Sequence, residues 1–356
     1  MNSSALCQRL GLQVPVFLAP MAGAADIQLA IEVAKAGGLG SLACAMLKPD
    51  QIREQVAYFR KEAPGCALNL NFFCHTPPVP DAEREARWRR QLEPYYEEFS
   101  IDTSTPVTGP SRAPFDEAAC ALVEELRPEV VSFHFGLPDV ALLARVKATG
   151  ALVISSATTP DEARWLEQHG SDAIIAQGLE AGGHRGNFLD PGLTGQSGTL
   201  ALVPQMVDAV NVPVIAAGGI ADGRGLAAAL SLGATAVQLG TAYLWCPESK
   251  ISATHRQELK TGQRATAVTN VFTGRPARGL ITRLMRELGP IAPDVPEFPT
   301  AAAALVGLKA MARPEAALDF TPLWAGEAYQ LGREIPAREL TASIAAEAAA
   351  LLKRLP

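Results

Sequence analysis

The amino-acid sequence predicts an α/β protein of the (β/α)₈ (TIM) barrel class, with an insertion after the third strand and a helical extension at the carboxyl end. Two features predict the barrel. Eight short apolar runs recur within residues 1–246, and most are followed by a Gly or polar turn and an Ala- or Leu-rich stretch. Most of the runs are continuously apolar, which is typical of parallel strands buried on both faces. An open, doubly wound sheet is the alternative that the same order of elements allows.

The individual elements follow from this alternation of strand and helix signals. The strands that we expect are, in chain order, residues 14–19, 40–45, 66–73, 130–135, 151–156, 173–177, 212–217 and 235–240. The clearest helical stretches between them are residues 27–36, 49–61, 160–168 and 223–231. Because the carboxyl ends of barrel strands carry the active site, the last residues of each expected strand are the places to look for chemistry.

Two segments interrupt the alternation. Residues 76–115 combine a proline cluster, a charged helix over residues 81–96 and a polar loop. This insertion follows the third strand on the face where barrel active sites lie, so a lid and an inert surface excursion are both open interpretations. Residues 247–356 contain Ala-rich stretches between prolines, which predicts a set of helices packed on the barrel rather than an independent domain.

The composition limits the classes of protein. Of the 356 residues 48% are hydrophobic and 19% charged, which suits one large buried core and not a disordered chain. The net charge of −6 argues against a nucleic-acid or membrane-surface partner, so an anionic substrate would need a local positive field. No run approaches the ~20 apolar residues of a bilayer span, and no signal peptide is evident. We therefore expect a cytoplasmic enzyme, whose oligomeric state the sequence leaves open.

The cysteines do not indicate a metal or disulfide framework. The chain has six, and they are scattered without a CxxC pair or a paired Cys/His spacing. We interpret them as small buried core residues, with disulfides or a zinc site as the alternative, and expect no metal. The fingerprints GxGxxG, GxxxxGK[ST], HExxH and GxSxG are also missing from the sequence, so the simplest dinucleotide, NTPase, metalloprotease and serine hydrolase sites are not indicated.

Two glycine turns predict a phosphate site. Gly218 and Gly219 end the seventh strand, and Gly240 and Thr241 end the eighth. Barrels commonly bind a phosphate with these two loops and a helix N-terminus, through backbone N–H groups that bare glycines leave accessible. Barrels that bind sugar phosphates use the same device, and such glycines can also simply let a strand turn into a helix. The pattern predicts a phosphate but does not by itself specify FMN.

His134 and His184 are the candidate catalytic residues. His134 lies at the end of the fourth strand, and His184 lies in a Gly-Gly-His-Arg-Gly turn after the sixth. Histidine moves protons near pH 7, although a lone histidine at a strand end is more often a satisfied core or turn residue. We expect the flanking glycines to leave His184 and Arg185 exposed over the barrel mouth. His75, His169 and His255 are interpreted as surface residues.

Taken together, the strand ends resemble those of a known family. The motifs are Ala-Pro-Met-Ala-Gly (19–23), Asn-Phe-Phe-Cys-His-Thr-Pro-Pro (71–78), Ser-Phe-His-Phe-Gly (132–136), Glu-Ala-Gly-Gly-His-Arg-Gly (180–186), Ala-Ala-Gly-Gly-Ile (216–220), Gln-Leu-Gly-Thr-Ala (238–242) and Asn-Val-Phe-Thr-Gly-Arg-Pro (270–276). In this order they resemble class I nitronate monooxygenases, the 2-nitropropane dioxygenase-like family of FMN barrels. The resemblance covers nearly the whole chain.

The resemblance implies a detoxifying flavoenzyme with non-covalent FMN. Anionic alkyl nitronates such as propionate 3-nitronate would be oxidised by dioxygen, through a flavin semiquinone, to a carbonyl compound plus nitrite or nitrate. His134 would match the substrate-site histidine, and His184 would match the base that related enzymes use on neutral nitroalkanes. The flavin contacts that it implies are Pro20, Met21, Ala22, Asn71, Gln177, Gly182, Gly183, Gly218, Gly219, Gln238, Leu239, Gly240 and Thr241.

Three other functions remain as alternatives. The nearest is an NAD(P)H-dependent FMN reductase of the same superfamily, an enoyl-acyl-carrier-protein or quinone reductase, which shares the Gly-Gly-His turn and the phosphate loops. The histidine at the end of the fourth strand favours the nitronate enzyme over this reductase. A flavin-free isomerase or synthase for a phosphorylated substrate and a non-enzymatic flavin-binding protein fit less well. Which histidine is base and which is anchor, and whether neutral nitroalkanes are substrates, stay open.

Overall fold

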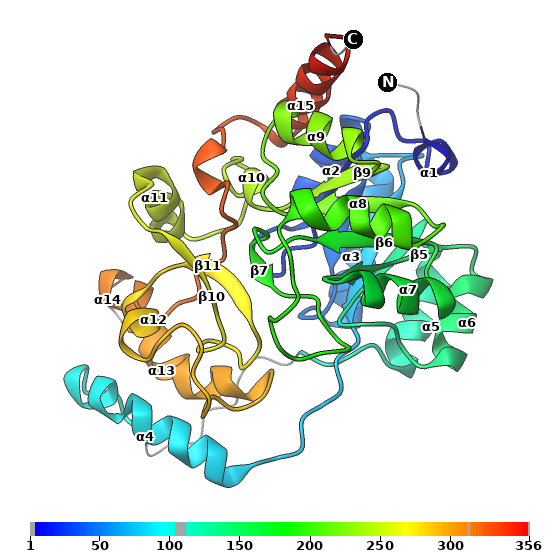
Figure 1. Cartoon of the computed structure of the whole chain (residues 1–356). Helices are drawn as coiled ribbons and strands as arrows, with labels where there is room; N and C mark the ends of the chain where they lie inside the picture. Colours follow the sequence, from blue (N-terminus) through cyan, green and yellow to red (C-terminus); the bar gives the residue numbers. More distant parts are fainter. Residues whose placement is uncertain (1–3, 104–111, 312–313, 355–356) are drawn as a thin grey trace.

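Eight parallel strands form a barrel at the centre of the molecule (Figure 1). The computed structural model describes residues 4–103, 112–311 and 314–354. The strands lie in the sheet order β1-β9-β8-β6-β5-β4-β3-β2, and a parallel bridge between Phe17 and Leu39 joins the two ends of the sheet. The predicted barrel is confirmed, and the open sheet is wrong. The strand bounds are β1 Val16–Leu18, β2 Gly40–Ala43, β3 Leu68–Phe73, β4 Val130–His134, β5 Leu152–Ala157, β6 Ala173–Gln177, β8 Val214–Ala217 and β9 Ala236–Leu239.

Helices cover the outside of the barrel, and most begin at a side-chain cap. Asp26, Asp116, Asp139 and Asp222 each accept a hydrogen bond from a backbone N–H of the first turn, which satisfies donors that the helix itself cannot pair. The barrel helices are α2 Ile27–Lys35, α3 Pro49–Glu62, α5 Glu117–Leu126, α6 Val140–Ala148, α7 Pro160–Gln168, α8 Thr199–Ala209, α9 Gly223–Ser231 and the short α10 Thr241–Leu244. The four predicted barrel helices are therefore present, with ends shifted by one residue at most.

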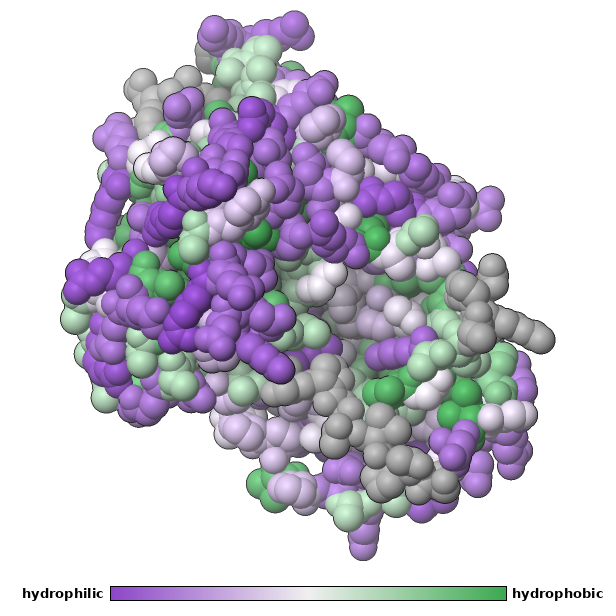
Figure 2. Space-filling model, turned by 180° about the vertical axis from the view of Figure 1, so that it is seen from behind, coloured by the Kyte–Doolittle hydropathy of each residue, from purple (hydrophilic) through white to green (hydrophobic). Residues whose placement is uncertain are grey.

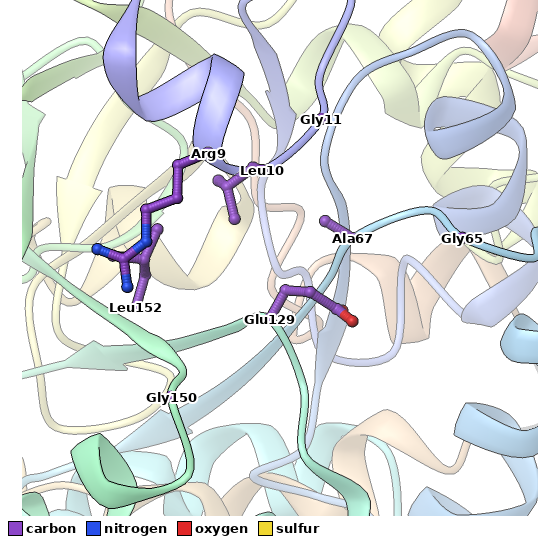
Figure 3. A pocket seen from close by; sticks show the side chains of 8 residues that line it. All are labelled: Arg9, Leu10, Gly11, Gly65, Ala67, Glu129, Gly150 and Leu152. Carbon is purple, nitrogen blue, oxygen red and sulfur yellow. The ribbon is translucent and has the colours of Figure 1, made fainter.

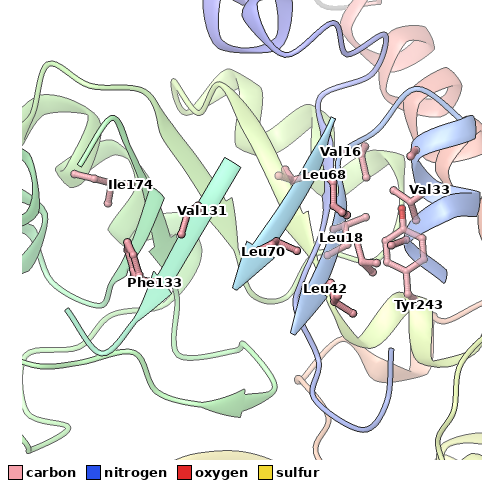
Figure 4. Close-up of a cluster of buried hydrophobic side chains, with 14 of the residues drawn as sticks. Val16, Leu18, Val33, Leu42, Leu68, Leu70, Val131, Phe133, Ile174 and Tyr243 are labelled. Carbon is pink, nitrogen blue, oxygen red and sulfur yellow. The ribbon is translucent and has the colours of Figure 1, made fainter. Parts of the chain in front are cut away.

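Each barrel strand buries both of its faces, as the continuous apolar runs predicted. One face packs on the surrounding helices, and Figure 4 shows part of this layer, with Leu68 and Leu70 of β3 and Val131 and Phe133 of β4. The other face fills the barrel interior, where Leu6 of helix α1 (Ala5–Arg9) joins the strand side chains. Because α1 contributes to this interior core at the amino-terminal ends of the strands, the opposite, carboxyl ends are left for a site.

A second, smaller lobe is built from the insertion and the tail together. Helix α4 (Ala82–Glu98) of the insertion places Trp88 and Tyr95 in one hydrophobic core with Phe272 and Phe320 of the tail. Figure 1 shows α4, α12 and α13 side by side in this lobe. The helical bounds of the tail are α11 Ala253–Thr261, α12 Arg283–Glu287, η1 Thr300–Leu305, α13 Val306–Lys309, α14 Pro314–Leu318, η2 Tyr329–Leu331 and α15 Ala337–Leu352.

The tail is not purely helical, which corrects our prediction. It contains strands β10 (Thr266–Thr269) and β11 (Ala277–Leu280), and β11 also pairs with the short strand β7 (Gly183–His184) that follows β6. Four-residue strands with half-buried Thr and Ala carry little pattern, so periodicity could not identify them. The chain then returns to the barrel, where α15 packs against α9 and α2. The division at residue 247 and the lid function of residues 76–115 stay predictions.

Two further features concern the expectations from composition. All six cysteines are free thiols, and four of them are buried. Within residues 4–103, 112–311 and 314–354 no helix has both the length and the apolar character needed to cross a bilayer.

Candidate active site

The structure brings His134 and His184 together at the carboxyl ends of the strands. The Nε2 atom of His134 lies 3.2 Å from the backbone oxygen of His184. The side-chain amide of Gln177, at the end of β6, donates to the same oxygen at 2.9 Å and accepts from the N–H of Gly186 at 2.7 Å. Gln177 thus ties the turn that carries His184 to the end of its strand. Its side chain is already engaged within the protein.

The protonation state of His134 follows from its two partners. A carbonyl oxygen can only accept, so Nε2 carries the proton that bonds to His184. Nδ1 is then an acceptor, and the Ser156 hydroxyl, 3.1 Å away, donates to it. Burial, with Arg275 nearby, lowers the pKa of His134 to about 3, so the ring is neutral. Both ring nitrogens are used within the protein, so no N–H of His134 is left to anchor an anion. The resemblance had suggested that His134 lies at the substrate.

His184 is held by the tail as well as by the barrel. Its backbone forms part of β7, in register with Ala277 of β11, and its Nε2 atom lies 3.0 Å from the Thr273 hydroxyl. Burial and the charges of Arg112 and Arg275 lower the pKa of His184 well below 6.5. No described residue bonds to its Nδ1 atom, so one nitrogen of a neutral ring is left for a ligand.

His75 belongs to the same cluster, and its interpretation as a surface residue was wrong. The ring is 6% exposed and packs edge-on against Phe298 at 4.8 Å between centroids and against Phe135 at 6.1 Å. Burial lowers its pKa to about 4, with Arg275 and Arg112 as further causes. His75 follows the end of β3 by two residues and therefore lies at the carboxyl ends of the strands. The prolines that follow it in the sequence suggested a surface loop instead. His255 is also buried, in helix α11, whereas His169 is exposed as expected.

Most of the positive charge near the histidines comes from arginines other than Arg185. The Arg185 side chain is fully buried, and its guanidinium donates to the backbone oxygens of Gln177 and Gly178 at 2.7 Å. It therefore supports the turn. Our expectation that it is exposed over the barrel mouth was wrong. Arg112 and Arg275 lie nearer to the rings: Arg275 stacks on Phe135 at 3.9 Å and Arg112 lies over Phe298 at 5.5 Å.

In the described part of the chain these two arginines and Lys309 form no ion pair, although the charge of Glu162 acts on Arg275 and raises its pKa. Burial lowers the pKa of all three groups, to about 10 for Arg275 and, with Arg112 adjacent, to about 8 for Lys309. One nitrogen of each guanidinium, Nη1 of Arg112 and Nε of Arg275, is buried without a hydrogen-bond acceptor. Unpaired buried charge is costly, so the arrangement fits a site that receives an anion.

The two predicted glycine turns form a cradle that a side chain would fill. Gly218 and Gly219 have φ values of +113° and +68°, which favour glycine. A Cβ atom on Gly218 would lie 3.0 Å from the Ala181 nitrogen, and one on Gly240 would touch Met21 Sδ at 3.5 Å. The N–H groups of Gly219 and Gly240 donate to no acceptor in the described part of the chain. Such a cradle of free N–H groups fits a phosphate, so the residues present are compatible with FMN.

The other residues implied as flavin contacts lie at the ends of strands β1, β3 and β9 or directly after them. Pro20, Met21 and Ala22 follow β1 beside Gly240, and Asn71 lies buried on β3, where its amide donates to Ser132 Oγ at 2.9 Å. Leu239, in contrast, points into the core between barrel and helices, so it offers only its backbone. Gln238, half-buried on β9, lies in register with Ala217.

A tail segment that the sequence did not indicate closes the phosphate end. The N–H of Gly326 donates to the Thr241 hydroxyl at 2.9 Å. A Cβ atom on Gly182 would lie 2.6 Å from the Gly326 nitrogen, so the two glycines allow close contact of their backbones. Gly183, with φ +76°, has open space beside it. In the sequence only Gly326 itself could have pointed to this close contact.

Two hollows of the molecule lie at different places in the fold. From behind, the surface is hollowed between the barrel and the smaller lobe (Figure 2). A different pocket of about 360 Å³ lies at the amino-terminal ends of the strands, between Arg9 and Glu129 (Figure 3). The Glu129 carboxylate there is already bonded to Arg60 and to the N–H of Leu68. Barrel enzymes use the carboxyl ends of their strands, so we assign no chemistry to this pocket at the amino-terminal ends.

Comparisons with known proteins show what the chain is similar to. A family model described as nitronate monooxygenase matches residues 3–347. The nitronate monooxygenase of Pseudomonas aeruginosa is 41% identical over 95% of this chain and 97% of its own length, and that of Paraburkholderia phytofirmans is 39% identical over 96% and 94%. A nitroalkane oxidase structure from Streptomyces ansochromogenes matches with a TM-score of 0.89 at 36% identity, covering 99% and 100% of the two chains. FabK from Thermotoga maritima matches with a TM-score of 0.73 at 27% identity, covering 100% and 99%.

Proposed function

The chain belongs to the nitronate monooxygenase family of oxidoreductases, and from this premise we propose that it oxidises alkyl nitronates with dioxygen, using FMN. The observation that carries this proposal is a set of partly buried cations, none of them in an ion pair among the described residues, beside two neutral histidines. Arg112 and Arg275 supply the local positive field that an anion needs in a protein of net charge −6. Carbonyl compound and nitrite or nitrate would be the products.

The glycine cradle supports FMN as the cofactor. The phosphate would receive N–H groups of Gly219 and Gly240, and the ring system would lie toward Met21. When bound, FMN would supply the electron-accepting chemistry that no side chain here provides. Thr241 would be free to donate its hydroxyl proton to the phosphate, because the bond from Gly326 uses the hydroxyl only as an acceptor.

The two histidines have different tasks in this proposal. A nitronate already carries the carbanion-like charge, so its oxidation needs no proton abstraction. A neutral nitroalkane needs a base, and His184 has a free ring nitrogen. His134 would hold the backbone of His184 in place and would not touch the substrate itself. This replaces the anchoring role that the resemblance implied.

The cation cluster favours a nitronate with a second negative group, such as the carboxylate of propionate 3-nitronate. We expect Arg112→Met to raise the KM for this substrate about 10- to 100-fold, because a hydrogen bond to a charged group contributes about 1.5–3 kcal/mol. Arg164→Met is the matched control, since Arg164 is exposed and pairs only with Asp161 of its own helix. Steady-state oxygen consumption measures both variants. An unchanged KM for Arg112→Met contradicts the anion site.

The cofactor and the activity can be tested together. The purified protein should be yellow, should release FMN on denaturation, and should consume oxygen when propionate 3-nitronate is added. FAD in the extract, or no flavin binding after reconstitution, would contradict the cofactor assignment. FMN without oxygen uptake on any nitronate would contradict the activity.

A further inference from the structure

We propose that Thr273 is a positioning residue that fixes the tautomer of His184, so that Nδ1 is the atom that takes the proton from a neutral nitroalkane. The inference rests on the proposed function for its chemistry and on hydrogen bonds for its geometry. Thr273 lies in the tail, 89 residues from His184 along the chain, within the connection between β10 and β11. The tail would thereby complete the catalytic site of the barrel.

The direction of each hydrogen bond decides the tautomer. Thr273 Oγ1 lies 3.0 Å from His184 Nε2 and 3.3 Å from the backbone oxygen of Arg275. The carbonyl can only accept, so the single hydroxyl proton of Thr273 is directed to it. Thr273 Oγ1 is then the acceptor toward the ring, and His184 carries its proton on Nε2. The lone pair of the neutral ring is consequently on Nδ1, the nitrogen without a partner among the described residues.

The connection that carries Thr273 is fixed by its own contacts. The side chain of Asn270 bonds twice to the backbone of Ala292, at 2.8 and 2.9 Å, and the N–H of Gly274 donates to the backbone oxygen of Asn270 at 2.8 Å. A Cβ atom on Gly274 would lie 2.0 Å from the Pro296 oxygen, so only glycine fits at this contact. Thr273 itself is 1% exposed. The same hairpin pairs β11 with β7, so it holds both the backbone and the ring of His184.

In this step His184 Nδ1 accepts the proton of the carbon that bears the nitro group. The electron pair of that C–H bond forms the C=N bond of the nitronate, and the electron pair of one N=O bond moves onto its oxygen. The ring becomes an imidazolium beside the new anion. The charges of Arg112 and Arg275 act on the ring and disfavour a lasting imidazolium. The protonated Nε2 keeps its bond to Thr273 in both states.

Nitrogen NMR of the FMN-loaded protein tests the tautomer directly. Histidine labelled with nitrogen-15 gives signals for the five imidazoles, and the His184 pair is assigned by its loss in His184→Asn. We expect a protonated Nε2 and an unprotonated Nδ1 in the native protein and in Thr273→Ser, and loss of this preference in the isosteric Thr273→Val. A native spectrum with the proton on Nδ1 overturns the inference. This readout does not depend on turnover, so failure of the proposed function is seen separately, as absence of nitronate oxidation.

Kinetics provide the second readout. We expect Thr273→Val to lower kcat/KM on a neutral nitroalkane by about 10²-fold, the size of effect that misplacing a reacting group produces. Thr273→Ser should restore it, and turnover of the preformed nitronate should stay close to native in both variants. Thr282→Val is the matched control, because Thr282 is equally buried in the same lobe but its hydroxyl has no hydrogen-bond partner among the residues that the structure describes. Native activity of Thr273→Val, or a loss that Thr273→Ser does not restore, overturns the positioning role.

Discussion

Replacement of His184 by Asn is expected to lower the oxidation of neutral nitroalkanes by ~10²–10⁴-fold, the usual effect of losing a general base. Oxidation of the preformed nitronate should stay close to that of the native protein, because this substrate gives up no proton from carbon. The structure supports the distinction, since His184 keeps one ring nitrogen free while both nitrogens of His134 are bonded within the protein.

Oxygen consumption with each substrate form measures this difference. His169→Asn is the control, because His169 is exposed and stacks on Trp165 away from the cluster. The pH profile adds a second check. Since the pKa of His184 is lowered, its basic form is retained as the pH falls, and the acid limb of the neutral-substrate profile should lie below pH 6.5. Equal losses on both substrate forms would show that His184 does not act as the base.

Gly240→Val is expected to abolish FMN retention, a weakening of at least ~10²-fold or about 2.8 kcal/mol, and with it all activity. The φ of Gly240 is −110°, outside the left-handed region, and a Cβ atom there would make ordinary contacts of 3.5 Å with Ala19 and Met21. The added methyl groups would occupy the approach to the proposed phosphate donors. The flavin-free protein should therefore remain folded while losing its cofactor.

Fluorescence titration with FMN and thermal unfolding of the apoprotein separate these effects. Gly219→Val is less informative, because φ is +68° at that residue and a Cβ atom would lie 3.2 Å from Glu180, so it strains the fold as well. If Gly240→Val binds FMN with native affinity, the phosphate lies elsewhere. If the apoprotein unfolds at a much lower temperature, the substitution acts on the fold and a smaller residue must replace valine.

The barrel could be predicted from sequence because its signal is local. Each strand is a short apolar run buried on both faces, and each glycine turn follows directly from a strand end. Strand ends converge in any barrel, so the pairing of His134 with His184 also followed from their places in the chain. These predictions needed no knowledge of the tail.

The rest of the site could not be predicted, because it depends on contacts between distant segments. Arg275 and Lys309 are residue types usually found at the surface, and only the packing of the tail places Arg275 near the histidines and Lys309 near Arg112. Arg185 shows the opposite error, since the glycines beside it suggested exposure while carbonyl oxygens of its own turn bind the guanidinium. Nothing in the sequence distinguishes Thr273 from the other threonines of the chain as a residue of the site.

Anaerobic reduction of the bound flavin tests the central claim most directly. The reduction is followed by absorbance after mixing the purified protein with propionate 3-nitronate and, separately, with NADH. The proposed function predicts that the nitronate bleaches the flavin band and that NADH does so negligibly. Rapid bleaching by NADH, with no response to the nitronate, would contradict it and identify the protein as a flavin-dependent reductase of the same superfamily.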